Sequence, residues 1–151
     1  METTFTFDSK KHTIKFNYSA FFKANRAFSE LDKAGNSMNN GAAVLFNKLI
    51  NQDDTAFLDV IRLYVPNKTS DEQIMGIVDE MTEEGKTVEE LADEFIEEMK
   101  TSGFFRRAVN SYIKMMEKGL EMLKKKKQTE ENDASISMVD SQLTSLKEAI
   151  S

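Results

Sequence analysis

Over residues 88–123, apolar residues recur mostly at alternating spacings of three and one, and the pattern breaks only around Gly103. Such spacing places the apolar side chains on one face of a helix, and glycine can adopt the left-handed conformation that closes a helix. The pattern predicts two amphipathic helices that meet at Gly103 and pack as an antiparallel pair. The two faces comprise Val88, Leu91, Ala92, Phe95, Ile96 and Met99, then Phe105, Ala108, Val109, Tyr112, Ile113, Met116, Leu120 and Leu123.

The two predicted helices carry opposite charge. Residues 79–98 include ten acidic side chains and one basic, whereas residues 100–127 include nine basic side chains and two acidic. Exposed ion pairs contribute only about 0.2–1 kcal/mol each, while burying a large apolar side chain contributes roughly 1.5–3 kcal/mol. We therefore expect the apolar faces to hold the pair together and the surplus charge to select orientation and partners.

The first 16 residues indicate a β-hairpin. Apolar and polar residues alternate on both sides of the turn-forming residues 8–11, with Phe5, Phe7, Ile14 and Phe16 on the apolar face. Because two strands alone are marginal in water, this face should pack on the helices that follow.

The rest of the chain is predicted to be helical. Helices are expected from Ser19 to Gly35, over Gly41–Ile50, between the break at residues 51–53 and Pro66, and from Ser70 onward. Capping boxes at residues 70–73 and 87–90 mark the starts of two helices, because a hydroxyl is followed three residues later by Gln or Glu.

The expected fold is mainly α, with a small N-terminal β-hairpin packed on a bundle of about five to six helices. A long antiparallel helix pair and a flexible C-terminal segment end the chain. We place one domain over residues 1–127, with the hairpin in 1–17 and the helices in 18–127. Residues 128–151 are polar at their start and predict a flexible tail that can form a short helix.

Composition excludes several classes of protein. Without cysteine, disulfides and thiolate chemistry are impossible. The net charge of −6 disfavours a general nucleic-acid binder. Because neither a signal sequence nor a long apolar run is evident, we expect a soluble intracellular protein without membrane contact. The single histidine, His12, is expected at the surface. Glu90, Glu94 and Glu97 share a helix face, but a solvated acidic face explains them better than a metal or acid–base site.

The order of segments resembles a known family over nearly the whole chain. After the hairpin and first helix come GAAVLFNKLIN and DDTAFLDVIRLYVP, then TVEELADEFIEEMKTSGFFRRAVNSYIKMMEKG. This layout is similar to the tail assembly chaperones of long-tailed, siphovirus-type bacteriophages or prophages. Its most specific part is the acidic helix that runs through Ser-Gly-Phe-Phe into a basic amphipathic helix.

The resemblance implies a protein that is not an enzyme, needs no cofactor and acts in the host bacterial cytoplasm. It implies a chaperone that binds and solubilises the tape-measure protein and helps to recruit tail tube protein, and that is absent from the mature virion. Because a tape measure offers many successive sites, we also expect a homo-oligomer. The family carries no signature site residues that could be transferred to this chain.

Contact residues are predicted from the chain itself. Charged helices joined at a Phe-Phe pair suit the binding of a partner that must later be released. Phe104 falls outside the apolar spacing that includes Phe105, so Phe104 is the better candidate for contact with a partner. Methionine adds an adaptable apolar contact. The predicted partner-binding residues are Phe104, Arg106, Arg107, Glu94, Glu97, Glu98 and Met115.

Two further hypotheses remain open at this stage. In many members of the resembled family, a −1 ribosomal frameshift produces a longer form that recruits tube protein. In this chain, residues 145–147 would provide a slippery site if they were encoded AGU UUA AAA. The lysine run 124–127 is a second candidate. Alternatively, a small phage-encoded adaptor or regulatory protein that binds a host protein would have similar composition. Gene position beside the tube and tape-measure genes discriminates between these functions.

Overall fold

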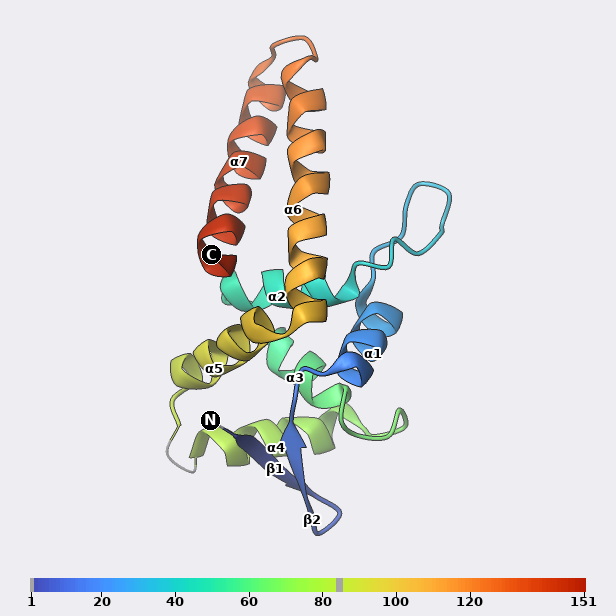
Figure 1. The fold of residues 1–151 in the computed structure, drawn as a ribbon, viewed down its shortest axis with the longest axis vertical. Helices are drawn as coiled ribbons and strands as arrows, with labels where there is room; N and C mark the ends of the chain where they lie inside the picture. Colours follow the sequence, from blue (N-terminus) through green and yellow to red (C-terminus); the bar gives the residue numbers. More distant parts are fainter. Residues whose placement is uncertain (1, 84–85) are drawn as a thin grey trace.

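The computed structural model describes residues 2–83 and 86–151. Within these residues the chain forms one β-hairpin and seven helices, which confirms the predicted mainly α fold with an N-terminal hairpin. Figure 1 shows a helical body with the hairpin at one end and two long helices projecting from the other. The elements are β1 (Thr3–Phe7), β2 (Lys10–Ile14), α1 (Tyr18–Phe28), α2 (Gly41–Ile50), α3 (Thr55–Arg62), α4 (Asp71–Glu83), α5 (Val88–Thr101), α6 (Gly103–Lys124) and α7 (Glu130–Ile150).

The hairpin turns over two residues, Asp8 and Ser9, whose φ angles are 51° and 62°. Positive φ at both central positions is the geometry of a type I′ turn, which matches the twist of the paired strands. Phe5 and Ile14 are buried on the face that meets the helices, and Phe16 follows them into the core. The hairpin therefore packs on the helices as its alternation predicts.

Helix α2 lies at the centre of the body. It packs against α1, α3, α5, α6 and α7, and six of its ten residues are buried. A helix surrounded by other helices needs no polar face. This environment explains why the sequence GAAVLFNKLI contains so few polar residues.

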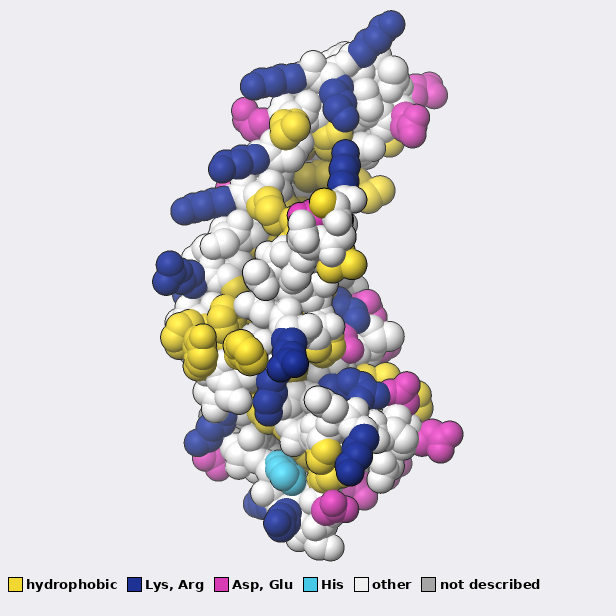
Figure 2. All heavy atoms as spheres, turned by 90° about the vertical axis from the view of Figure 1, so that its right-hand side faces the viewer, with side chains coloured by type: hydrophobic (Ala, Val, Ile, Leu, Met, Phe, Trp, Pro, Cys, Tyr) yellow, Lys and Arg dark blue, Asp and Glu magenta, His cyan; other side chains and the backbone are white. Residues whose placement is uncertain are grey.

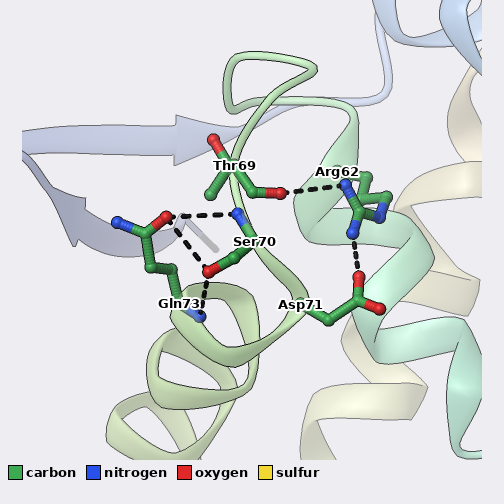
Figure 3. A network of polar contacts seen from close by, with 5 residues as sticks. All are labelled: Arg62, Thr69, Ser70, Asp71 and Gln73. Atoms are coloured by element: carbon green, nitrogen blue, oxygen red, sulfur yellow. Dashed lines mark hydrogen bonds and ion pairs between the residues drawn. The ribbon is translucent and has the colours of Figure 1, made fainter.

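Both predicted capping sequences lie at helix starts. At α4, the Ser70 hydroxyl accepts a hydrogen bond from the Gln73 backbone N–H (3.2 Å), and the Gln73 amide oxygen accepts one from the Ser70 N–H (3.1 Å; Figure 3). At α5, the Thr87 hydroxyl accepts a hydrogen bond from the Glu90 N–H (3.1 Å). These bonds satisfy N–H groups that have no partner inside the helix.

An arginine links α3 to the start of α4. The Arg62 guanidinium donates to the Thr69 carbonyl (3.3 Å) and forms an ion pair with the Asp71 carboxylate (Figure 3). Arg62 stands in the last turn of α3 and Asp71 in the first turn of α4, where each charge also complements its helix dipole. The connection between the two helices is thereby held in place.

Helix α1 is shorter than predicted. The chain leaves the helix after eleven residues and forms a loop, so Leu31 is 66% exposed instead of extending the buried stripe. Polar side chains near the helix end compete for backbone groups: the Asn25 amide oxygen accepts a hydrogen bond from the Ala42 N–H (2.8 Å), and the Ser29 hydroxyl accepts one from the Gly41 N–H (2.9 Å). These bonds cap α2 and close the loop at its base.

The long antiparallel pair consists of α6 and α7, and the prediction that α5 pairs with α6 in this way was wrong. Figure 1 shows α6 rising away from α5 and α7 returning beside α6. Helix α6 has 22 residues and α5 has 14, so at 1.5 Å per residue α6 is about 12 Å longer. Its C-terminal half extends beyond α5, and α7 packs beside it in the antiparallel direction (Figure 1). Leu143, Leu146 and Ile150, toward the end of α7, are buried.

The apolar faces of α5 and α6 are nevertheless buried, with Phe16 lying between them. The ring centroid of Phe16 is 5.9 Å from that of Phe95 in α5 and 5.3 Å from that of Phe105 in α6, both edge to face. Such aromatic contacts add stability beyond the burial of apolar area. The spacing of apolar residues thus identified the buried faces but not what covers them.

The polar composition after residue 127 predicts a flexible segment with a short helix, but Glu130–Ile150 form a continuous helix. Its start is capped by Thr129, whose hydroxyl accepts a hydrogen bond from the Asn132 N–H (3.1 Å). Lys147 pairs with Glu117 of α6 across the helix pair (3.3 Å). Because only one face of α7 contacts α6, a modest number of apolar residues is enough to hold it.

Candidate functional site

The start of α6 separates two neighbouring phenylalanines. Successive residues of a helix point about 100° apart, and Phe105 is fully buried against the rings of Phe16 (centroid separation 5.3 Å) and Phe21 (5.9 Å). Phe104 is 47% exposed, and its ring contacts those of Tyr18 (4.7 Å) and Phe21 (5.5 Å). The exposure of Phe104 agrees with its position outside the apolar spacing of the sequence.

Phe104 forms one wall of a groove of ≈ 430 Å³ between α1, the loop of residues 29–40 and α6. Figure 2 views the molecule from the side that carries α1. Apolar side chains gather at the level of α1, beside lysine and arginine side chains (Figures 1 and 2). Met38 from the loop and Met115 from α6 are 37% and 41% exposed. This aromatic groove is lined by Tyr18, Phe21, Met38, Phe104, Tyr112 and Met115.

Hydrogen bonds between its two ends close the 29–40 loop, which forms one side of the groove. The Asn40 amide oxygen accepts from the Glu30 N–H (2.9 Å), and the Asn40 amide nitrogen donates to the Glu30 carboxylate (2.8 Å). The Met38 N–H donates to the Glu30 carbonyl (2.9 Å). Sequence reasoning missed Met38, because it assigned the loop partly to a helix. It also missed Tyr18, which lies one residue before the predicted start of the first helix. The high methionine content was the signal of an adaptable surface.

The groove also offers a hydroxyl group. Burial raises the pKa of the Tyr112 hydroxyl, and the charge of the Glu30 carboxylate raises it further. The hydroxyl therefore stays protonated at neutral pH and can both donate and accept a hydrogen bond.

Basic side chains border the aromatic groove on α6. Arg107 lines the groove and also a shallow hollow beside it, which Arg106 and Lys114 line as well. All three side chains are exposed. The structure thus brings three of the predicted contact residues, Phe104, Arg107 and Met115, into the lining of one groove. Arg106 points about 200° around α6 from Phe104 and lines only the neighbouring hollow.

The three predicted acidic contact residues lie on α5, outside the lining of this groove. The Glu94 carboxylate accepts hydrogen bonds from the Thr3 hydroxyl (2.7 Å) and the Lys86 ammonium (2.6 Å). Burial opposes its ionisation, but these bonds and the charge of Lys86 outweigh burial and lower the pKa of Glu94. Glu97 is exposed and lies 3.6 Å from the Lys100 ammonium.

Glu98 is half-buried beside the hairpin. Its Oε2 atom is buried and has no hydrogen-bond partner among the described residues. Burial raises the pKa of Glu98, and the charge of Glu94 raises it further. Glu94 is therefore engaged within the fold, whereas the Glu98 carboxylate is half-buried with one unpartnered oxygen among the described residues. Contact of the three acidic residues with a partner stays a prediction.

The described part of the chain contains no group of three His, Asp or Glu side chains close enough together to hold a metal ion. Across the same residues, no helix combines the length and apolar character needed to cross a bilayer. The aromatic groove presents tyrosine, phenylalanine, methionine and arginine side chains. These residue types are enriched at protein–protein interfaces.

Comparison with known protein families finds a match to this chain. Residues 4–114 match the family described as "Phage tail assembly chaperone protein, TAC", and this region runs from β1 into the middle of α6. No curated protein and no solved structure matches the chain. The matched residues include α1, the 29–40 loop and the part of α6 that carries Phe104. Because the match covers well over half of the sequence, the chain belongs to the family of phage tail assembly chaperones.

Proposed function

We propose that this chaperone binds and solubilises the tape-measure protein of its phage and helps to recruit tail tube protein during tail assembly. The observation that supports this proposal is the aromatic groove, which exposes aromatic and methionine side chains beside arginines on a member of this family. A stable protein rarely leaves such side chains grouped at its surface without a binding role.

The groove fits an amphipathic helix of the partner. A helix can place apolar residues on one stripe into an apolar groove, and unbranched methionine side chains adapt to different residues along that stripe. Arg107 and Lys114 favour a helix whose flank is acidic. Contacts of this kind are limited in area, which suits a chaperone that must release its partner when the tail tube forms.

The same proposal covers location and assembly. The protein acts in the cytoplasm of the host bacterium, self-associates along the tape measure and is absent from the mature virion. A longer form made by −1 frameshifting carries the contact with tail tube protein. Mass spectrometry of infected cells tests that form: we expect a peptide that spans the frame junction, and its absence at a depth where the short form is abundant would contradict the frameshift.

Removing two side chains of the aromatic groove tests the binding surface. We expect Phe104→Ala/Met115→Ala to reduce capture of the co-expressed tape-measure protein at least about tenfold, since buried interface side chains often contribute more than 1 kcal/mol each. The measurement is a pull-down of tape-measure segments with the tagged chaperone, quantified against the input of soluble tape-measure protein.

A matched control uses exposed methionines elsewhere. Met75 on α4 and Met138 on α7 are 49% and 63% exposed and do not line the groove, so Met75→Ala/Met138→Ala should leave capture unchanged. Equal losses for the two double variants would show that the groove is not the binding surface. No capture by the unaltered protein would overturn the proposed function.

A further inference from the structure

A second groove, of ≈ 540 Å³, lies between the end of α2, the start of α3 and the outer side of α5. Its floor is apolar and includes Leu49, Phe57 and Ile96, and Val88 at its edge is 44% exposed. Ala149, near the end of α7, also lines it. The groove is therefore placed at the base of the α6–α7 pair, which we term the arm.

Four carboxylates surround this apolar floor: Asp53, Asp54, Glu89 and Asp93. All four residues are exposed, and no salt bridge joins any of them to a basic side chain of the described residues. Asp53 accepts hydrogen bonds from the Thr55 backbone N–H (3.1 Å) and hydroxyl (2.6 Å). The acidic groove thus combines an apolar floor with a negative rim whose four carboxylates form no salt bridge within the described fold.

The opposite combination occurs at the tip of the arm. The lysine run 124–127 covers the end of α6 and the turn toward α7, and all four lysines are exposed. Met122, one turn earlier, is 66% exposed. Figure 1 shows this tip as the part of the molecule farthest from the hairpin. The tip therefore offers positive charge together with a flexible apolar side chain.

The tip cannot reach the acidic groove of its own chain. Helix α7 has 21 residues, so the tip and the groove at the base of the arm are separated by about 30 Å of helix. Contact between the two surfaces requires two molecules.

We propose that the tip of one copy's arm docks in the acidic groove of a second copy. This inference rests on the proposed function in one respect: the contact serves self-association along the tape-measure protein. The two surfaces differ, so each copy keeps one groove and one tip free for further neighbours, and the contact produces an open chain. Like charges repel in tip-to-tip and groove-to-groove contacts, which fixes the head-to-tail order.

Reversing the charge of each surface tests the contact. In the groove variant, Asp54→Lys/Glu89→Lys/Asp93→Lys reverses the rim while retaining Asp53, whose carboxylate accepts hydrogen bonds from Thr55 at the start of α3. In the tip variant, Lys125→Glu/Lys126→Glu/Lys127→Glu changes residues beyond the end of α6. We expect the weight-average mass by light scattering to rise with concentration at low salt for the unaltered protein, and each variant alone to associate at least about tenfold more weakly.

Mixing the two variants should restore association, because each then offers the charge that the other lacks. Three results would each overturn the inference. The mixture could fail to associate, either variant alone could associate as strongly as the unaltered protein, or the unaltered protein could stay monomeric at low salt. Should charge reversal prevent folding, as monitored by circular dichroism, Asp54→Asn/Asp93→Asn replaces the groove variant and must weaken association and reduce its salt dependence.

The two proposals fail separately. The groove variant leaves the aromatic groove unchanged, so its pull-down of tape-measure segments tests the proposed function without self-association. Loss of capture only in Phe104→Ala/Met115→Ala, with normal self-association, assigns the two activities to the two grooves.

Discussion

Replacing Phe105 by alanine should lower the free energy of unfolding by about 3–5 kcal/mol, the range observed for truncating a fully buried phenylalanine. Its side chain is 0% exposed and contacts the rings of Phe16 and Phe21. Through these contacts it joins α6 to α1 and to the segment that follows the hairpin. Urea denaturation of the purified protein measures the loss, with the midpoint shifting at a constant slope if two-state behaviour is kept.

The adjacent residue provides the control. Phe104 is already 47% exposed, so Phe104→Ala should cost less than about 1.5 kcal/mol, because less apolar area returns to water. The expected order is therefore reversed between assays: Phe105→Ala affects stability most, whereas Phe104→Ala affects tape-measure capture at unchanged folding. Similar stability losses for the two variants would contradict the division of roles between these neighbours.

Replacing Gly41 by alanine should destabilise the protein by about 3 kcal/mol or more, the upper range for overpacking a core. A Cβ atom at this position would lie 2.0 Å from the Ala24 carbonyl oxygen and 2.9 Å from the Asn25 Cα atom. Both are backbone atoms, so no side-chain rotation relieves the clash. Helix α2 would have to move away from α1, which would disturb the bonds that close the 29–40 loop.

Gly119 is the matched control, because it is also helical but has open space around its Cα. Apart from the adjacent residues and the backbone of its own helix, no atom lies within 4 Å of a Cβ built there. Alanine is also the better helix former by about 0.8–1 kcal/mol. Gly119→Ala should therefore raise the midpoint of thermal unfolding while Gly41→Ala lowers it. If Gly41→Ala proved neutral or stabilising, the close approach of α1 and α2 would be incorrect.

The sequence determined the features that depend on neighbours in the chain. The capping box at Ser70 and Gln73 forms as expected because both partners lie within one helical turn. The apolar spacing correctly marked Leu91, Phe95 and Phe105 as buried, since helical geometry alone decides which residues share a face. The same spacing left Phe104 outside the core. Resemblance of the quoted segments to the tail assembly chaperones was sufficient to identify the family.

The tertiary structure alone decided which elements cover those faces. Apolar spacing is the same whether α6 meets α5 or α7, and only the length of α6 and the presence of Phe16 between Phe95 and Phe105 select the observed packing. The aromatic groove depends on Met38, which lies beside α6 in a loop closed by the bonds of Asn25 and Ser29 to the start of α2 and by the bonds between Glu30 and Asn40. Glu94 is likewise engaged by Thr3, 91 residues away. Contacts between residues so far apart leave no periodic pattern in the sequence, because they are fixed by how complete helices fit together in space.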